Sequence, residues 1–208
     1  MHGSLSWKTF LCPEYEFTAF PRGALVVDVG CGEGDQLAKL RLRGCIGVGI
    51  DVDRTAAAVC RAKGLLAVLA RAEELPLRKE IADGVICKVA IPYTDESAAI
   101  AECARLLRPG GRMVASYHAA GYYLRLVLCE PSAKLRFYGL RALVNTWLYR
   151  LTGKRIRGWV GDTLYQSRRR LDRYYSMTGL ALEEETAGRR FLAFAVFVYH
   201  RLRKLDSR

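Results

Sequence analysis

Residues 25–34, LVVDVGCGEG, constrain the fold of this chain more than any other stretch. Leu25–Val29 is short, mostly apolar and rich in β-branched residues, which is typical of a strand buried on both faces of a sheet. Leu37 and Leu40 follow at helical spacing. The turn between strand and helix can bend sharply and approach a ligand closely, because it holds three residues without a Cβ, Gly30, Gly32 and Gly34. The stretch predicts a strand, a tight turn and a helix whose first N–H groups face a nucleotide-type ligand.

The spacing of these glycines favours one class of nucleotide ligand. A dinucleotide-binding fingerprint is G-x-G-x-x-G, and its third glycine would fall at the position of Asp35. This counts against NAD and FAD. The order is instead Asp28 followed by G-x-G-x-G over Gly30–Gly34. It resembles the first motif of class I S-adenosylmethionine-dependent methyltransferases, in which the turn passes under the methionine part of the cofactor.

The next strand pattern extends the same resemblance. Ile46–Ile50 is followed by Asp51, about 20 residues past the glycine turn, where an acidic side chain suits a ribose with two hydroxyls. The alternative role for Asp51 is a helix N-cap, but Asp53 can cap the following helix instead. We therefore expect Asp51 and the adjacent Val52 to bind the cofactor.

Two later segments are similar to the family as well. Residues 70–76, ARAEELP, resemble the loop that brackets the adenine, usually written D-A-x-x-L-P. Arg71 stands where the family mostly has an acidic residue, although the backbone of Ala72 could still serve the ring edge. Residues 106–112, LLRPGGR, closely resemble the family's post-helix turn. The resemblance is continuous in order and spacing over residues 23–116.

The resemblance implies an α/β fold: a Rossmann-like doubly wound sheet of seven strands in the order 3-2-1-4-5-7-6, the last strand antiparallel, with a helical lid inserted after strand five. It implies one methyltransferase domain over residues 1–208, with S-adenosylmethionine as cofactor and S-adenosylhomocysteine as product. Residues 1–23 would form an aromatic lead-in and residues 119–162 the insertion. The expected cofactor-binding residues are Asp28, Gly30, Cys31, Gly32, Gly34, Asp51, Val52, Ala72, Glu73 and Lys88.

The closing part of the fold is predicted from apolar runs and turns. A basic helix is expected over Thr163–Met177, and Gly179 ends it. Leu180–Thr186 and Phe191–Tyr199 are expected to form the closing antiparallel hairpin. The tail from Arg201 is short and charged, so we expect it to be frayed.

The insertion contains an amphipathic helix over Phe137–Leu151. Its apolar stripe repeats at i, i+3 and i+4 spacing, with Arg141 and Arg150 off the stripe, and consists of Leu140, Leu143, Val144, Trp147, Leu148 and Leu151. Three interpretations remain open: a lid over a substrate, ordinary packing against the core, and a helix at a membrane interface. We favour the lid, because this fold commonly carries one at this point.

The positive charge is concentrated in the last part of the chain. Residues 1–121 carry 15 Lys and Arg against 14 Asp and Glu, whereas residues 122–208 carry 18 against 7. Such a field attracts an acidic small molecule, a phosphorylated lipid at a membrane surface, or nucleic acid. A solvated basic face is the equally simple alternative.

The cysteines and histidines do not suggest a disulfide framework or a metal site. The seven cysteines are scattered without a C-x-x-C pair, and the three histidines are far apart. The sequence has no run of 18 uncharged apolar residues and no apolar signal region at its start. We expect a cytoplasmic protein, with peripheral association at a membrane surface left open.

Catalytic candidates must follow strands four and five, because open α/β sheets bind ligands at the carboxyl ends of their strands. Tyr93 and His118 occupy these places. His118 has a suitable unperturbed pKa for a general base, although a histidine satisfied structurally at a strand end is the simpler interpretation. A base is needed only where the methyl acceptor carries a proton.

We expect a methyltransferase that acts on a small molecule, anionic or hydrophobic, resembling the broad group that includes quinone-biosynthesis and natural-product enzymes. Methylation of RNA or another anionic macromolecule is the first alternative, favoured by the basic C-terminal part, where Tyr165, Tyr174 and Tyr175 could stack bases. A cofactor-binding protein without catalysis is the second alternative, because a fold shared with enzymes does not prove chemistry. The sequence does not predict an oligomeric state.

Overall fold

The computed structural model describes residues 15–152 and 164–206. A seven-stranded sheet has the order β3-β2-β1-β4-β5-β9-β6, and β9 runs antiparallel to both of its neighbours. Its strands, in chain order, are β1 (Leu25–Val29), β2 (Ile46–Asp51), β3 (Leu66–Leu69), β4 (Ala82–Lys88), β5 (Leu107–His118), β6 (Leu180–Ala187) and β9 (Phe197–Lys204). Because β9 is the seventh strand of this sheet, the predicted order and the antiparallel last strand are confirmed.

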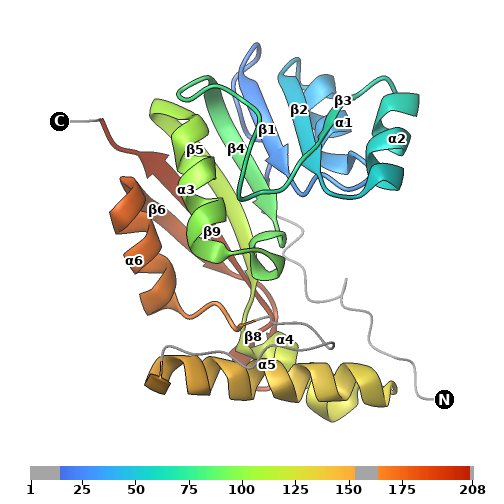
Figure 1. The fold of residues 1–208 in the computed structure, drawn as a ribbon, viewed down its shortest axis with the longest axis vertical. Helices are drawn as coiled ribbons and strands as arrows, with labels where there is room; N and C mark the ends of the chain where they lie inside the picture. Colours follow the sequence, from blue (N-terminus) through green and yellow to red (C-terminus); the bar gives the residue numbers. More distant parts are fainter. Residues whose placement is uncertain (1–14, 153–163, 207–208) are drawn as a thin grey trace.

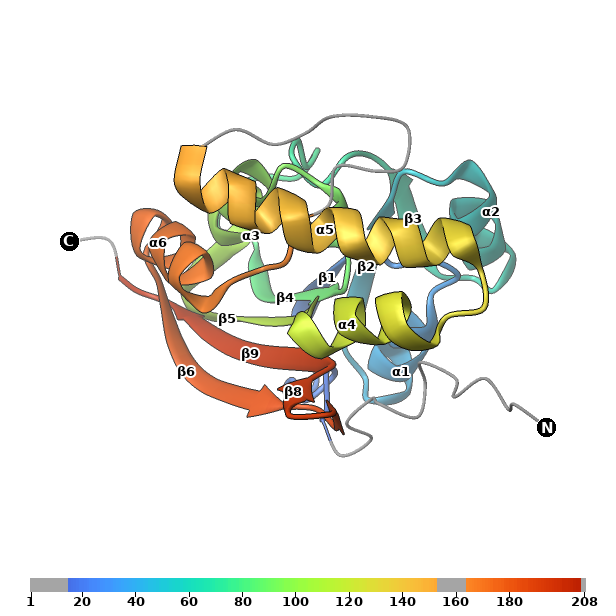
Figure 2. The same ribbon diagram turned by 90° about the horizontal axis from the view of Figure 1, so that it is seen from below.

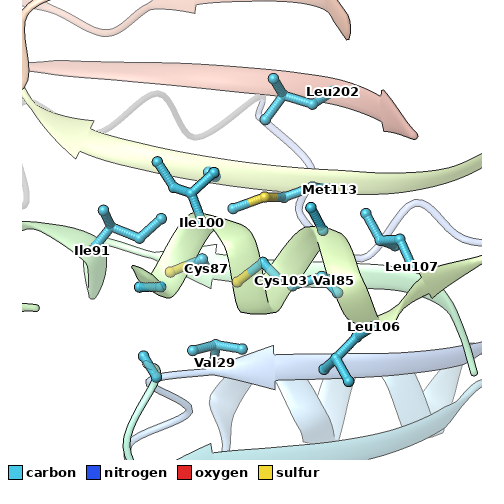
Figure 3. Packing of buried hydrophobic residues seen from close by; sticks show 14 of the residues in the cluster. Val29, Val85, Cys87, Ile91, Ile100, Cys103, Leu106, Leu107, Met113 and Leu202 are labelled. Carbon is cyan, nitrogen blue, oxygen red and sulfur yellow. The ribbon is translucent and has the colours of Figure 1, made fainter. Parts of the chain in front are cut away.

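Helices cover both faces of this sheet (Figure 1). They are α1 (Asp35–Leu42), α2 (Arg54–Ala62), α3 (Glu96–Leu106), α4 (Ala120–Cys129), α5 (Ala133–Thr152) and α6 (Arg168–Thr178), with a 3-10 turn η2 at Ile91–Tyr93. On one face, α3 and α6 bury a large cluster in which Ile100, Cys103 and Met113 are fully enclosed (Figure 3). On the other face, α1 packs with Phe17 of the lead-in. The central strands are thus shielded on both sides, as their apolar sequences require.

The predicted lead-in, residues 1–23, is described from Tyr15 onward. Two of its aromatic residues, Trp7 and Phe10, lie outside the described residues. Tyr15 stacks on Tyr199 of β9 with ring centroids 4.6 Å apart, and Phe17 is buried. The ring of Phe20 lies where a side chain at Gly84 of β4 would stand. The described lead-in is therefore part of the core.

The closing hairpin differs from the predicted one in its boundaries. A small hairpin, β7 (Arg190–Phe191) and β8 (Phe194–Ala195), occupies the start of the predicted second strand and packs against α4. Strand β9 therefore begins only at Phe197. It continues to Lys204, paired with β5 and β6, so the prediction of a frayed tail from Arg201 was wrong up to that residue.

The insertion after β5 is helical, as predicted, and consists of α4 and α5 in its described part. The two helices lie side by side below the end of the sheet (Figure 2). Their contact is close, because a Cβ on Gly139 of α5 would lie 2.9 Å from the Cβ of Leu126 in α4. The face of α5 that is buried consists of small or polar residues, Gly139, Ala142 and Asn145.

The predicted apolar stripe of α5 does not pack against the core. Leu140, Val144, Trp147 and Leu151 are all exposed, and Trp147 keeps 64% of its surface accessible. Packing, one of the three interpretations of this stripe, is therefore wrong for these four residues. Helical periodicity identifies which side chains share a face, but not which face a neighbour covers.

A buried polar chain ties β5, α6 and β9 together. The hydroxyls of Tyr117 and Tyr175 are 2.8 Å apart, and the Tyr175 hydroxyl lies 2.8 Å from Nδ1 of His200. Nε2 of His200 in turn lies 3.1 Å from a carboxylate oxygen of Glu185. Buried polar groups need such partners, so this chain fixes how α6 sits on the antiparallel end of the sheet.

We predict that Tyr175→Phe lowers the free energy of unfolding by about 1–3 kcal/mol, because it leaves the Tyr117 hydroxyl and His200 Nδ1 without their shared partner. Urea unfolding followed by circular dichroism measures the loss. The matched control is Tyr93→Phe at an exposed tyrosine, which should change the value by less than about 0.5 kcal/mol. Equal midpoints for the two variants would contradict this role of Tyr175.

Candidate functional site

A cavity of about 450 Å³ opens where β1, β2 and β4 end. Six of the predicted cofactor-binding residues line it: Gly30, Asp51, Val52, Ala72, Glu73 and Lys88. The remaining four do not line it but belong to β1 and the adjoining glycine turn: Asp28, Cys31, Gly32 and Gly34. Parallel strands end at one edge of the sheet, so residues far apart in the sequence meet at this cavity.

The glycine turn brings the backbone close to the end of β4. Gly30 has φ +76°, and a Cβ at this position would lie 2.5 Å from the Cβ of Ala90. The N–H of Gly30 donates to the carbonyl of Ile50 in β2 at 2.8 Å. Gly34 (φ +86°) has a structural reason to be glycine, since a Cβ there would lie 2.7 Å from Leu65.

Asp51 holds the turn as well as lining the cavity. One carboxylate oxygen accepts a hydrogen bond from the N–H of Gly32 at 2.8 Å, and the other accepts one from the N–H of Asp53 at 2.9 Å. Asp53 in turn accepts from the N–H of Thr55 and caps α2, which is the division of roles predicted for the two aspartates. The carboxylate of Asp51 is thus fixed at the cavity wall.

Asp28 is buried in β1, next to the lining residue Val29, and has an unusual electrostatic environment. Its Oδ2 has no hydrogen-bond partner among the described residues. Burial, together with the charges of Asp51 and Asp35, raises the pKa of Asp28 to about 7 against the opposing charge of Lys88. A buried carboxylate without a full set of partners fits a ligand that brings a positive charge to this point.

Arg71, which replaces the acidic residue usual in the family, lies in the wall of the cavity. Arg71 is 71% exposed in its side chain and pairs with a carboxylate oxygen of Glu73 at 3.1 Å. The same oxygen of Glu73 accepts a hydrogen bond from the N–H of Asp95 at 3.0 Å. The positive charge at position 71 is therefore balanced locally, and the backbone of the buried Ala72 stays at the cavity wall.

One lining residue that the sequence did not single out is Val89. It has φ +58°, a conformation that is rare and strained for a β-branched residue. Its N–H donates to the carbonyl of Ser116 in β5 at 3.1 Å, which holds the strained turn in place. Val29, Ile50, Ala70, Ala90 and Thr94 line the cavity as well. Their place directly beside the predicted positions was the only signal available.

Comparison with known proteins shows what this part of the chain is similar to. Residues 27–115 match the family model of the methyltransferase domain. A Methanosarcina mazei structure described as an S-adenosylmethionine-dependent methyltransferase superposes with a TM-score of 0.67 at 14% identity, covering 90% of this chain and 95% of that one. Residues 27–115 are thus similar to the methyltransferase domain, and the fold is the one described for S-adenosylmethionine-dependent methyltransferases. The predicted family and fold are confirmed, and the comparisons support S-adenosylmethionine as the cofactor.

Two curated relatives of the methyltransferase domain match the same part of the chain. A tRNA (carboxymethyluridine(34)-5-O)-methyltransferase of Arabidopsis thaliana is 29% identical over 106 residues, which are 49% of this chain and 26% of the relative. An uncharacterized methyltransferase of Mycobacterium tuberculosis is 39% identical over 90 residues, 42% of this chain and 37% of the relative. The chain thus spans only about a quarter to a third of these relatives.

The residues present in the methyltransferase domain fit this cofactor. The unpaired Oδ2 of Asp28 suits the positively charged methionine end, and the cradle at Gly30 has no room for a side chain. The fixed carboxylate of Asp51 suits the ribose hydroxyls. Asp28, Gly30 and Asp51 are all among the cofactor-binding residues predicted from the sequence motifs.

On the acceptor side, the methyltransferase domain gathers aromatic rings around the end of β5. The ring of His118 stacks on Tyr122 with centroids 3.7 Å apart and an interplanar angle of 1°. Tyr93 meets His118 edge-on at 6.2 Å, and Tyr123 does so at 6.1 Å. Tyr93 itself is 62% exposed and lines the cofactor cavity.

The two predicted catalytic candidates are therefore brought together, but in an environment that disfavours charge. Burial lowers the pKa of His118 to about 3 and raises the pKa of Tyr93. The imidazole is neutral at physiological pH, and its Nδ1 has no partner among the described residues. A base with so low a pKa is weak, which favours a role in lining or positioning over proton transfer.

We predict that Asp28→Asn stabilises the cofactor-free protein at about pH 8 more than at about pH 5. With its pKa raised from 3.8 to about 7, folded Asp28 holds a proton that the unfolded chain has lost, so wild-type stability falls as pH rises through this range. The amide side chain of the variant carries no such proton, so the stability of the variant does not fall with pH for this reason. Thermal melts across this pH range measure it, and a melting difference that does not grow with pH would contradict the assignment.

A second prediction concerns cofactor affinity. Asp51→Ala removes a charged group that also holds the Gly32 N–H, so the dissociation constant for S-adenosylmethionine should rise at least about tenfold. Isothermal titration calorimetry measures the change. Asp53→Ala, two residues away, should cost about 1 kcal/mol of stability as a lost helix cap and leave the affinity unchanged. Unchanged affinity in Asp51→Ala would refute its cofactor role.

Proposed function

We propose that this domain transfers the methyl group of S-adenosylmethionine to a small-molecule acceptor with a planar or hydrophobic body. The observation that carries the proposal is the cluster of aromatic rings around His118, which borders the cofactor cavity through Tyr93. Rings arranged in this way pack well against an apolar or flat group and interact less favourably with a charged one. Substrate pockets of this kind lie at the carboxyl edge of open α/β sheets.

The chain's own part in the reaction is to hold two molecules in line. When bound, S-adenosylmethionine supplies a methyl group that its sulfonium already activates, so positioning accounts for most of the rate. Asp28, Cys31 and the glycine turn would hold the methionine end, Asp51 and Val52 the ribose, and Ala72 and Glu73 the adenine. Lys88 lines the same cavity, and its Nζ is 5.7 Å from the ring centroid of Phe17.

Tyr93 and His118 are the residues proposed to meet the acceptor. The neutral imidazole can accept or donate one hydrogen bond, and the tyrosine hydroxyl can do both. A role for the insertion, residues 119–162, as the cover of this pocket is part of the same proposal. Its support is that α4 supplies Tyr122 and Tyr123, and that Tyr138 of α5 lies 6.4 Å from the ring of Tyr123.

Methylation of RNA is the second candidate function. Two observations favour it: the Arabidopsis relative is named as a tRNA methyltransferase, and the excess of positive charge lies in residues 122–208. Non-specific binding of RNA would then fall steeply as salt is raised. The aromatic enclosure of the acceptor side favours the small molecule over this alternative.

A labelled-methyl experiment separates the two candidates. The protein is incubated with methyl-tritiated S-adenosylmethionine and either a small-molecule extract or total RNA, and the label is followed in each fraction. We expect transfer into the organic or aqueous small-molecule fraction and none into RNA. Asp51→Ala, with weakened cofactor binding, should reduce the signal strongly. Label in RNA alone would overturn the small-molecule proposal in favour of the alternative.

A further inference from the structure

The outer face of α5 presents an apolar ridge to solvent. Its exposed side chains recur at alternating spacings of three and four residues and therefore form one straight line: Phe137, Leu140, Val144, Trp147 and Leu151. They lie opposite the face that packs on α4 through Gly139 and Ala142. Figure 1 shows α5 as the outermost layer at the end of the molecule away from the body of the sheet. The ridge is thus free to meet a flat surface.

Basic side chains border this ridge. A second cavity, of about 620 Å³, lies between α5 and α6 and is lined by Trp147, Arg150, Arg169, Arg170 and Arg173. Arg170 is bound to Glu96, with Nε 2.8 Å from a carboxylate oxygen. Arg150, Arg169 and Arg173 have no acidic partner among the described residues. The cavity therefore offers three uncompensated guanidinium groups directly beside an exposed tryptophan.

The cavity also has a neutral hydrogen-bonding group suited to an anion. Ser167 lines it and precedes the first turn of α6 without capping it by its side chain, whereas the Thr146 hydroxyl already donates to the carbonyl of Ala142. The positive end of a helix of 11 residues thus adds to the field of the arginines. Guanidinium groups bind phosphate oxygens in a bidentate manner. The chemistry favours a phosphate monoester or diester.

The charge around the ridge indicates which class of partner binds it. Residues 131–152 contain four Lys and Arg and no Asp or Glu. A second copy of this chain would bring equally positive charge to the same line, which opposes pairing of the two ridges. The aliphatic members of the ridge, Leu140, Val144 and Leu151, offer RNA neither hydrogen bonds nor stacking. An apolar line bordered by cations matches the interface of a bilayer with anionic headgroups.

No helix in residues 15–152 or 164–206 is long and apolar enough to cross a membrane. The ridge of α5 is one side chain wide, and the opposite face of the helix is already buried on α4. Both facts restrict the contact to the headgroup region and the first part of the acyl chains, where tryptophan is most favourable.

We propose that α5 docks this domain on an anionic phospholipid bilayer, with the ridge in the interface and a lipid phosphate in the arginine-lined cavity between α5 and α6. The contact delivers the domain to a membrane surface and requires no cofactor. The docking proposal can therefore be tested independently of the methyl-transfer proposal. Attraction of the arginines to the headgroups and burial of the ridge each contribute to the binding.

Vesicle co-sedimentation of the full chain tests this docking. The probes are phosphatidylcholine vesicles with and without phosphatidylglycerol, at low and physiological salt. We expect binding to the anionic vesicles only, weakened by salt. Val144→Gln combined with Trp147→Gln should reduce the partition coefficient at least about tenfold, because the apolar contribution is lost. Arg150→Glu combined with Arg173→Glu should reduce it by at least as much.

Matched controls use the same changes at exposed sites elsewhere. Leu42→Gln in α1, at a leucine that is largely exposed, and Arg61→Glu in α2 should bind as the wild type does. Circular dichroism shows that each variant is folded. Equal binding to neutral vesicles, equal loss in the controls, or no binding of the wild type would overturn the proposal. The proposal would also be overturned if the wild type did not bind vesicles but self-associated, and if Trp147→Gln abolished that self-association. The ridge would then be an interface with a second copy of the chain.

Discussion

The close approach of three strand ends at the glycine turn is the constraint on which the rest of the domain depends. The N–H of Gly30 donates to Ile50 of β2, Gly32 donates to Asp51, and Gly30 leaves no space for a side chain against Ala90 after β4. A cavity opens there because the backbone replaces side chains at its base. The turn therefore fixes how closely β1, β2 and the end of β4 approach one another, and Gly30 lines the cavity between them.

This closeness has an electrostatic cost that a ligand can offset. Asp28 is enclosed beneath the turn, where burial disfavours its charge and Lys88 restores part of it. Val89 holds a strained conformation at the same edge. Buried charge and backbone strain concentrate at functional sites because the surrounding fold stabilises them. The end of β5 differs, since His118 is buried among aromatic rings there and its pKa is lowered by that burial.

The sequence brought six of the ten predicted cofactor-binding residues to one cavity because the signals for them are local. The turn, Asp51 and the loop around Ala72 each carry their signal within a few residues, and parallel strands bring them together by rule. The orientation of α5 was not predictable, because the ridge at Trp147 is apolar whichever face is covered. The start of β9 at Phe197 depends on the β7–β8 hairpin packing against α4, a tertiary contact that leaves no local pattern.

The central claim is that the glycine turn holds the methionine end of S-adenosylmethionine. A crystal structure of the protein grown with saturating S-adenosylhomocysteine tests it directly. We expect electron density for the ligand over Gly30–Gly34, with the ribose hydroxyls at the carboxylate of Asp51 and the amino group toward Asp28. Density at another place on the molecule, or none at a concentration that saturates related enzymes, would contradict the account.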